Sequence, residues 1–564
     1  MIFCADFETT TDLEDCRVWA YAIVNIDKVD EIIYGNDIDD FIRWCEDNAP
    51  ATVYFHNLAF DGSFIIDYIE RKGWKWVEHK KYMKKGNYCT LISDMNQVYS
   101  ISLSFGKKKV IEFRDSLKII PLSIADMAKA FKLPIQKGTL DYESYREVGH
   151  KLTDAEKEYI SYDVKIAAMS IKPFIEQGLS KLTAGSNALT DFYTILGGHK
   201  KFRMFYPYLN ELQDTFIRKA YRGGFTYVNP KYQSKKIGEG IVLDVNSLYP
   251  SVMYSCDGQL LPIGLPEWYN GEYVYDEEMP LWVGSVSCWF KVKPNHIPCI
   301  QLKANKMYKQ TEYIKDSGGE VSFITTSVDW ELIKNQYDLQ CVKFYGGYKF
   351  AACDFMFKPY VDKWIKIKNQ ATIDGNMGLR QIAKLMLNSL YGKFATRIKG
   401  YSRKPVMIDD SIHYIDMEEE KRNPVYLPVG VFITAHARYK TVMAAQSVYD
   451  RFLYADTDSL HLIGTELPDN LEIDNVKLGA WKHESTFYQA KFLRAKCYIE
   501  YENDCDNPTV HVAGMPKTCH SQVDIDNFEI GAEYDGKLYQ HRVKGGIVLV
   551  PGKMQIREDG RFVF

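Results

Sequence analysis

Residues 454–462 read Tyr-Ala-Asp-Thr-Asp-Ser-Leu-His-Leu and hold two carboxylates, Asp456 and Asp458, between aromatic and apolar ends. Side chains at positions i and i+2 of a β-strand point to the same face. Two like charges held side by side are unfavourable unless a cation lies between them, and oxygen ligands of this kind suit magnesium. The stretch therefore predicts a strand that carries a divalent-metal site. For an isolated Asp-Thr-Asp, the alternative is a solvent-exposed hairpin turn, where Asp is common.

A second group of carboxylates lies in the N-terminal third, on or beside predicted regular elements. Asp6 and Glu8 alternate on a predicted strand, a pattern that also suits an exposed edge strand. Asp61 lies between a β-rich run and an apolar helical pattern, where a carboxylate is either a helix cap or a ligand. Tyr159 and Asp163 share one face of a helix that a capping box would begin. An ordinary amphipathic helix remains the alternative there.

The clearest helical pattern covers residues 376–394. Its polar and aromatic members fall on one stripe, within about 80° of arc at 100° per residue. These are Arg380, Lys384, Asn388 and Tyr391. Apolar residues fill most of the remaining circumference, so this is not the pattern of a solvated surface helix. Two cations one turn apart, with an aromatic ring beside them, can hold a triphosphate and stack on a base.

The composition is that of a globular protein, with 46% hydrophobic and 26% charged residues among 564, too many for one core. The net charge of −4 means that binding of a polyanion must use local patches or metals. The 12 cysteines are scattered without a C-x-x-C pair, which argues against a disulfide framework or a zinc site and fits a reducing cytoplasm. No uncharged apolar stretch of about 18 residues is present, so we expect no membrane span.

Three N-terminal motifs together resemble the DEDD-type 3′–5′ exonuclease domain of family B DNA polymerases. They are Asp-x-Glu at residues 6–8, Asn-x-x-Phe-Asp at 57–61 and Tyr-x-x-x-Asp at 159–163. The resemblance implies two metal ions held by Asp6, Glu8, Asp61 and Asp163. It implies that Tyr159 orients the attacking water and that Lys137 assists catalysis. It also implies a single-stranded DNA site formed by Asn57, Phe60, Ser116, Leu117 and Tyr142.

The remaining motifs occur in the order of the same family. Residues 221–224 match Tyr-x-Gly-Gly, residues 244–251 match motif A, residues 384–392 match motif B, residues 454–459 match motif C and residues 496–498 match Lys-x-Tyr. The resemblance implies three catalytic carboxylates, Asp244, Asp456 and Asp458, with metal bound by Asp244, Asp458 and the Val245 carbonyl.

It implies a nucleotide site in which the Tyr249 ring leaves no room for a 2′-OH. The residues of this site would be Val245, Tyr249, Lys368, Arg380, Lys384, Asn388 and Tyr391, with Lys368 near the start of the helix that precedes motif B. Template and primer contacts would come from Tyr221, Arg222, Gly223, Gly224, Ser247, Lys496 and Tyr498.

We therefore expect an α/β and α+β multidomain protein, an RNase H-like exonuclease domain followed by a right-hand polymerase with two inserted subdomains. The expected boundaries are 1–185 for the exonuclease domain, 186–255 and 423–529 for the palm, 354–395 for the fingers and 530–564 for the thumb. Residues 256–353 would be the first insertion, in contact with a terminal protein or duplex. Residues 396–422 would be a protruding hairpin for strand displacement and processivity. Plain structural insertion and a disordered surface loop are the respective alternatives.

The compact length and the two insertions resemble the protein-primed branch of the family, which includes the small replicative polymerases of Bacillus phages. This implies template-primer DNA, dNTPs and a terminal protein as partners, two Mg²⁺ per active site with Mn²⁺ as a substitute, and the host cytoplasm as location. The protein would be a monomer or a heterodimer with the terminal protein. One alternative is a family B polymerase that needs an ordinary nucleic-acid primer. The other is a non-catalytic DNA-end binding protein, which predicts lost carboxylates, whereas all seven are present.

Overall fold

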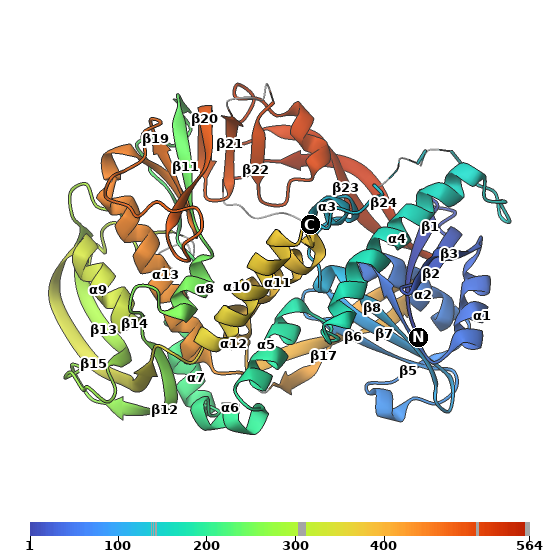
Figure 1. Ribbon diagram of the computed structural model, residues 1–564, viewed down its shortest axis with the longest axis horizontal. Coiled ribbons are helices and arrows are strands. Elements are labelled where there is room, and N and C mark those ends of the chain that lie inside the picture. The colour runs from blue at the N-terminus through green and yellow to red at the C-terminus, as the bar shows by residue number, and fades with distance from the viewer. Residues whose placement is uncertain are drawn as a thin grey trace.

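The computed structural model describes residues 1–136, 138, 140–141, 144–302, 312–422, 424–502 and 507–558. The predicted sites Lys137 and Tyr142 lie outside the described residues. The described part of the chain forms several mixed α/β layers, as the sequence predicted (Figure 1). No helix within it is long and apolar enough to cross a membrane.

The N-terminal sheet has the strand order β17-β16-β6-β7-β8-β4-β1-β2-β3, with β5 beside β6. Its strands are β1 (Ile2–Thr9), β2 (Val18–Asn25), β3 (Lys28–Gly35), β4 (Ala51–Phe55), β5 (Lys75–Trp76), β6 (Asn87–Ser93), β7 (Val98–Gly106), β8 (Lys109–Asp115), β16 (Lys399–Ile408) and β17 (Ser411–Lys421). Helices cover it: α1 (Ile38–Asn48), α2 (Leu58–Arg71), α3 (Ile124–Ala130) and α4 (Asp154–Glu176). The predicted capping box at Thr153 is present and begins α4.

The central sheet has the order β22-β21-β20-β11-β19-β18-β9, with β10 beside β20. Its strands are β9 (Thr226–Val228), β10 (Lys236–Ile237), β11 (Gly240–Val245), β18 (Phe452–Asp456), β19 (Ser459–Ile463), β20 (Trp481–Arg494), β21 (Cys497–Glu502) and β22 (Thr509–Val512). Helix α13 (Leu427–Ser447) packs against β18, β19 and α8 (Leu248–Tyr254). The sequence predicted a long helix at 431–451, so both predicted ends lie four residues after the observed ones.

Four strands within residues 261–353 form a separate sheet of order β12-β15-β13-β14, which α9 and α13 contact. Its elements are β12 (Leu261–Tyr269), β13 (Leu281–Val292), β14 (Val321–Thr326), α9 (Ser327–Gln336) and β15 (Tyr337–Cys353). The two long helices α10 (Lys358–Ile373) and α11 (Met377–Ser389) pair with each other, and α12 (Tyr391–Phe394) follows. The predicted helix 376–394 is therefore broken at Leu390.

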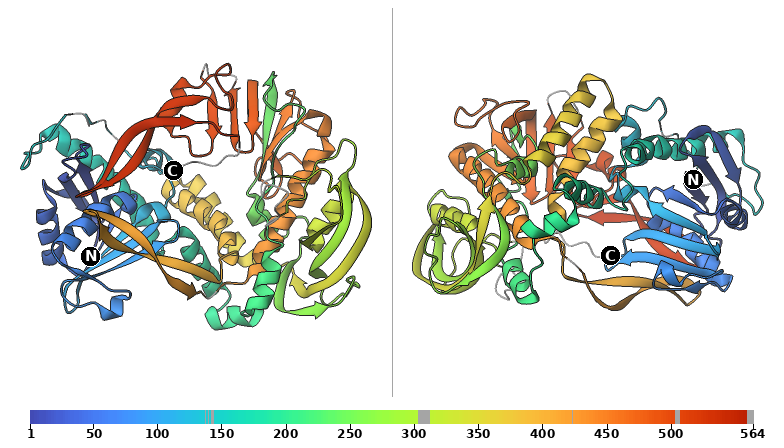
Figure 2. Two further views of the ribbon diagram at one scale, coloured as in Figure 1. Left: turned by 180° about the vertical axis from the view of Figure 1, so that it is seen from behind. Right: turned by 60° about the horizontal axis from the view of Figure 1, so that its bottom comes forward.

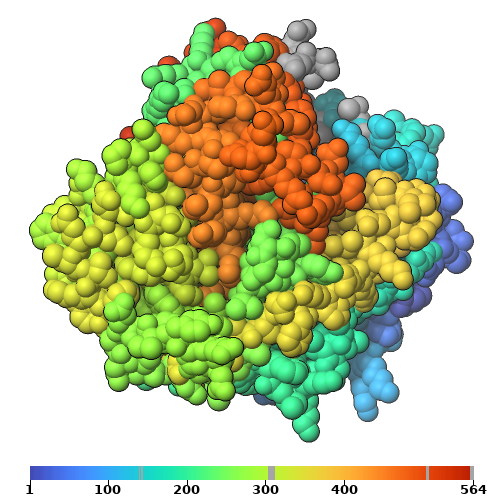
Figure 3. All heavy atoms as spheres, turned by 60° about the vertical axis from the view of Figure 1, so that its left-hand side comes forward, coloured from blue at the N-terminus to red at the C-terminus, as the bar shows by residue number. Residues whose placement is uncertain are grey.

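Three helices connect the N-terminal and central sheets: α5 (Ala184–Ile195), α6 (His199–Phe205) and α7 (Glu211–Arg218). The expected linker at 178–186 is shorter than predicted, because Thr183 caps α5. Short 3₁₀ turns lie at Lys80–Tyr82, Ser116–Lys118, Tyr449–Arg451 and Lys517–Gln522. Seen from another side, the α10–α11 pair (yellow) adjoins the segment that contains α8 (green) (Figure 3).

Two hairpins reach the N-terminal sheet from distant parts of the chain. The hairpin β16–β17 does not simply protrude, because Ser402 and Arg403 pair with β6 and extend the N-terminal sheet (Figure 2). Ile412 of β17 is buried in the N-terminal core. The C-terminal hairpin, β23 (Glu533–Val543) and β24 (Gly546–Gln555), was predicted as a hairpin and contacts β17 and α2.

Both hairpins rest on α2. The Arg71 guanidinium at its end donates to Asp67 of the same helix and to Asp410 in the β16–β17 turn. A Cβ placed on Gly546, at the start of β24, would lie only 2.6 Å from the Phe64 ring of α2. The backbone of the C-terminal hairpin therefore approaches this helix so closely that only glycine fits.

We expect Ile412→Ala to lower the local stability of the β16–β17 hairpin by about 2–5 kcal/mol, because it empties a buried position in the N-terminal core. Amide hydrogen exchange of β16, β17 and β6 measures this. Ile415→Ala is the matched control, since Ile415 lies on the same strand but is 38% exposed, and its effect should stay below about 1 kcal/mol. Equal protection in both variants would mean that the hairpin is not anchored by Ile412.

Candidate active sites

Cross-strand pairing places one row of side chains across the central sheet. Register pairing aligns Lys482 on β20, Asp244 on β11, Ser459 on β19, Asp456 on β18 and Thr226 on β9. Residues directly opposite each other in antiparallel strands project to the same face. The sheet thus brings together two predicted carboxylates that are more than 200 positions apart in sequence. We call these carboxylates, together with Asp458, the central site.

Asp458 lies in the turn between β18 and β19, not on a strand with Asp456 as predicted. Thr457 has a φ of 63°, which reverses the chain. The turn is held from three sides: the Val245 N–H donates to the Asp458 carbonyl at 2.8 Å, the Thr457 N–H donates to the Phe225 carbonyl, and the Thr441 hydroxyl donates to the Thr457 carbonyl. The alternative of a hairpin turn describes the backbone correctly, but the turn is anchored and half-buried.

Asp244 and Asp458 are both half-buried and lie near other negative charges. Burial, followed by the charges of Asp458 and Glu484, raises the pKa of Asp244 to about 6. Burial and, less strongly, the charges of Asp456 and Glu484 raise the pKa of Asp458. Such mutual repulsion favours a cation between the carboxylates. Among the described residues no three His, Cys, Asp or Glu side chains already surround one ion position, so an ion here would complete its shell with backbone, water or substrate oxygens.

Asp456 is instead compensated by the protein. Lys496 Nζ lies 2.8 Å from both of its carboxylate oxygens, and Thr226 Oγ1 donates to it at 3.0 Å. Lys496 is fixed in turn, because its N–H donates to the Tyr454 hydroxyl at 2.9 Å. Tyr498 was predicted to contact DNA, but its ring is only 8% exposed and stacks on His511 at 4.5 Å. The Tyr498 ring also lies 4.9 Å from the ring of Tyr454, whose hydroxyl accepts from the Lys496 N–H, and the DNA contact of Tyr498 stays a prediction.

Gly224 lies against the anchored turn. A Cβ at this position would be 2.6 Å from Thr457 Oγ1, so a larger residue would displace the turn. Arg438 of α13 holds the preceding backbone, because its Nη1 donates to the carbonyls of Arg222 and Gly223 at 2.8 Å while Asp329 binds the rest of its guanidinium. Residues 222–225 therefore brace the central site by close backbone contact.

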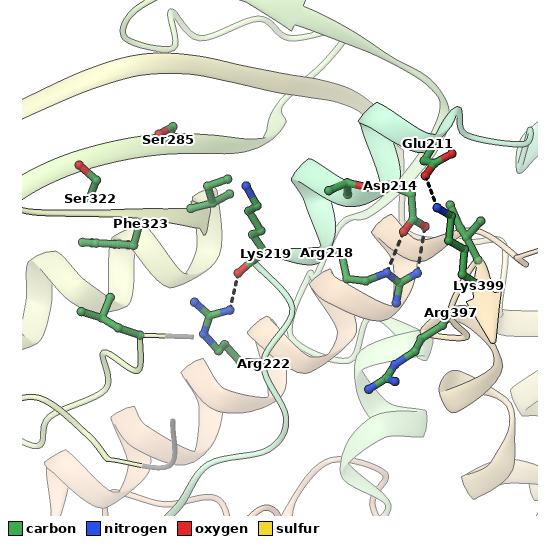
Figure 4. A pocket seen from close by; sticks show the side chains of 14 residues that line it. Glu211, Asp214, Arg218, Lys219, Arg222, Ser285, Ser322, Phe323, Arg397 and Lys399 are labelled. Carbon is green, nitrogen blue, oxygen red and sulfur yellow. Dashed lines mark hydrogen bonds and ion pairs between the residues drawn. The ribbon is translucent and has the colours of Figure 1, made fainter. Parts of the chain in front are cut away.

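The Arg222 side chain points away from this brace, into a pocket of about 790 Å³ beside α7, β13 and β14 (Figure 4). Its guanidinium donates to the backbone carbonyls of Gln301, Lys219 and Tyr221. Burial and then the charge of Arg438 lower the pKa of Arg222 to about 10. Tyr221, the other side chain of the motif, is half-buried. The Arg222 guanidinium thus holds the backbone around it, and its predicted DNA contact stays a prediction.

The predicted stripe on α11 has the expected exposure. Lys384 and Asn388 are exposed and Arg380 is half-buried, whereas Ile382, Ala383, Met386 and Leu387 on the other side are buried. Tyr391 follows the break, and its ring stacks on the Tyr249 ring of α8 with centroids 4.0 Å apart. The stack joins motif A to motif B. Ser247, which precedes α8, has a φ of 58° and is half-buried.

Lys368 lies near the end of α10, because that helix begins at Lys358, and not near its start as predicted. Burial, followed by the charges of Arg380, Lys384 and Lys482, lowers the pKa of Lys368. This shift places the four cations within electrostatic range of one another. Among the described residues, Lys368, Arg380 and Lys384 form no ion pair with a carboxylate.

The N-terminal carboxylates lie on three different elements that pack together. Asp6 and Glu8 alternate on β1, Asp61 is in the first turn of α2, and Tyr159 and Asp163 share one face of α4. Asp61, Asp163 and Tyr159 are each at most 5% exposed. Burial and then the charges of Asp6 and Glu8 raise the pKa of Asp61 well above its usual range. These carboxylates, the N-terminal site, also favour a bound cation.

Asp115 joins two backbone segments next to the N-terminal site. Asp115 is buried and accepts hydrogen bonds from the N–H groups of Asn57 at 3.0 Å and Leu117 at 2.9 Å. Asn57 has a φ of 78° and begins α2, and Phe60 packs edge-on against Phe64. Ser116 was predicted to contact DNA, but it is fully buried and its hydroxyl donates to the Phe55 carbonyl at 3.0 Å. The Ser116 hydroxyl thus holds the end of β4 in place, and the DNA contact of this residue stays a prediction.

Four residues near these sites escaped the sequence analysis. Lys482 and Glu484 belong to no recognised motif. Their positions beside Asp244 depend on the register of β20 against β11, where a bulge displaces Glu484 from the pairing. Arg438 lies within a mainly buried helix, which is the sign in the sequence that it has a buried partner. Asp115 looked like an ordinary strand end.

Comparison with known proteins agrees with this geometry. Residues 45–149 and 143–475 match the family described as DNA polymerase type B, organellar and viral. The chain is 44% identical to the DNA polymerases of Bacillus phage Nf and Bacillus phage phi29, over 99% of this chain and of each relative. It is 33% identical to the DNA polymerase of Streptococcus phage Cp-1, over 100% of this chain and 99% of that one.

Among solved structures, the fold is similar to that of phi29 DNA polymerase complexed with primer-template DNA and incoming nucleotide substrates. The TM-score is 0.91 at 42% identity, and the match covers 99% of this chain and 100% of that chain. The post-translocation complex of the same polymerase with primer-template DNA matches with a TM-score of 0.92. This protein is therefore a DNA polymerase that belongs to the organellar and viral type B family and is similar to the phage enzymes of that family.

Proposed function

We propose that the protein is a replicative DNA polymerase with a separate 3′–5′ proofreading site, and that it starts synthesis on a terminal protein and displaces the strand ahead. The main support for the polymerase site is that Asp244 and Asp458 lie near the cations of α10 and α11, to which Lys482 links them electrostatically. Two acids suit divalent metal, and unpaired cations suit a triphosphate. The relatives support the assignment, since phi29 DNA polymerase is known in complex with primer-template DNA and incoming nucleotide.

In the proposed polymerase site, Asp244, Asp458 and the Val245 carbonyl hold Mg²⁺, which when bound lowers the pKa of the primer 3′-OH and neutralises pyrophosphate. Lys384, Arg380 and Lys368 bind the triphosphate, and Asn388 lines the same stripe. The stacked rings of Tyr249 and Tyr391 form the floor beneath the sugar. Asp456 holds Lys496 in position for the primer strand.

In the proposed exonuclease site, Asp6, Glu8, Asp61 and Asp163 hold the metal ions and Tyr159 orients the attacking water. Lys137, outside the described residues, would assist. Single-stranded DNA would approach along Asn57, Phe60 and Leu117, with Tyr142 as a further contact. Gly223, Gly224 and Ser247 would let template backbone approach closely.

We further propose the domain boundaries expected from the sequence, with residues 256–353 as the surface for terminal protein or duplex and residues 396–422 as the element that separates downstream strands. The separate four-stranded sheet and the docked β16–β17 hairpin support two distinct inserted units. A polymerase that extends only nucleic-acid primers is the second candidate. Transfer of the first dNMP to a cognate terminal protein without any oligonucleotide would favour the first candidate, and its absence the second.

We expect Asp458→Ala to lower primer extension by more than about a hundredfold, while 3′–5′ digestion of single strands stays intact. The loss should be that large because removal of a residue that only supports a metal ligand already costs up to about a hundredfold. Asp6→Ala should do the reverse. Gel assays of extension and digestion on one labelled primer measure both activities. A single substitution that removed both activities equally would contradict two separate sites.

We expect Tyr249→Val to reduce discrimination against ribonucleotides roughly 10- to 200-fold, because removal of the ring opens space of the size of a small group. Single-turnover incorporation of rNTP and dNTP measures the ratio. Tyr254→Val on the same helix is the control and should keep the wild-type ratio. Unchanged sugar selection in the Tyr249 variant would remove the steric role from this ring.

Strand displacement is tested by extension of a primed single-stranded circle with the purified chain, Mg²⁺ and dNTPs. We expect product far longer than one circle, because the β16–β17 hairpin is fixed on the N-terminal sheet and can act as a rigid wedge. Deletion of residues 399–421 should confine the product to about one circle. If the intact chain also stops there, the hairpin has only a structural role.

A further inference from the structure

Lys482 lies on β20 beside the central site. It is the cross-strand partner of Asp244, and its Nζ lies 3.5 Å from Asp244 Oδ1. Its side chain is 34% exposed, so it can move within the site. The contact is too long for a strong hydrogen bond. Asp244 therefore attracts this ammonium group without fixing it.

Three elements bring four cations together at this place. Lys368 comes from α10, Arg380 and Lys384 come from α11, and Lys482 comes from β20. The lowered pKa of Lys368 reflects burial first and then the charges of the other three. Like charges held at this range are unfavourable in the free protein. A multiply charged anion between the helices and the sheet would remove the repulsion.

Lys482 differs from the other three cations in its partner. Asp244 attracts it from the adjacent strand, whereas Lys368, Arg380 and Lys384 form no carboxylate ion pair among the residues that the structure describes. A divalent cation at Asp244 would take over the charge of that carboxylate. The ammonium group of Lys482 would then be free for the phosphate oxygens that enter with the nucleotide.

We propose that Lys482 is a fourth triphosphate-binding cation, which contacts the incoming nucleotide from the sheet side while Lys368, Arg380 and Lys384 contact it from the helices. This rests on the proposed polymerase site. Lys482 faces Asp244 in the free enzyme and donates to a phosphate oxygen in the nucleotide complex. Its proton stays on Nζ throughout, and no covalent bond changes. The residue positions and binds substrate, and its effect is on affinity for the phosphates.

The test measures equilibrium binding of a dNTP to the full chain on a primer-template whose primer ends in a dideoxynucleotide, so that no chemistry follows. Ca²⁺ is the metal, and dNTP is compared with the matching dNMP. Lys482→Met keeps the length of the side chain and removes its charge. We expect the dNTP dissociation constant to rise about tenfold, the usual loss for one charged hydrogen bond, with dNMP binding unchanged. Lys482→Arg should restore dNTP binding to within about threefold.

Lys477→Met is the matched control. This lysine lies five residues before Lys482, is 59% exposed and pairs with Glu472, and its variant should bind dNTP like the wild type. Wild-type dNTP affinity in Lys482→Met would overturn the inference, as would equal weakening of dNTP and dNMP. Lys384→Met distinguishes failure of the Lys482 inference from failure of the whole proposed nucleotide site. If it loses dNTP affinity while Lys482→Met does not, only the role of Lys482 fails. If neither loses affinity, the proposed nucleotide site fails as well.

Discussion

Asp244, Asp456 and Asp458 place three carboxylates close together at one end of the central sheet, and each is held by different neighbours. Asp456 is neutralised by Lys496 and by the Thr226 hydroxyl. Asp244 and Asp458 lack such full compensation, and burial, followed by the charges of nearby carboxylates, raises the pKa of both. The sheet can hold this arrangement because β11, β18 and β19 are buried on α8 and α13. Packing of apolar side chains thus keeps in place charges that would otherwise separate.

Local patterns predicted those features that depend on one element. The stripe on α11 follows from a period of 3.6 residues, and the capping box at Thr153 lies within four consecutive residues. Both sets of carboxylates could be found because their motifs are contiguous and occur in family order. The hairpins at 399–421 and 533–555 could also be predicted, because each pairs with itself through a short turn.

Features that depend on the meeting of distant segments could not be predicted. Lys482 opposes Asp244 only through the register of two strands nearly 240 positions apart, and a bulge sets that register. The exact geometry of Asp458 depends on Thr457, whose positive φ is stabilised by Phe225 and Thr441 from other elements. Ser116 and Tyr498 match family positions, yet the burial of their side chains is a tertiary property that the motifs do not reveal.

The helix α2 has a further consequence, because it joins the N-terminal site to two distant hairpins. Asp61 lies in its first turn, and its body and far end bear both the β16–β17 hairpin, through Arg71 and Asp410, and the C-terminal hairpin, through Phe64 and Gly546. A displacement of either hairpin that moves α2 therefore also moves Asp61. The position of Asp61 in the N-terminal site is thus mechanically connected to both hairpins through one helix.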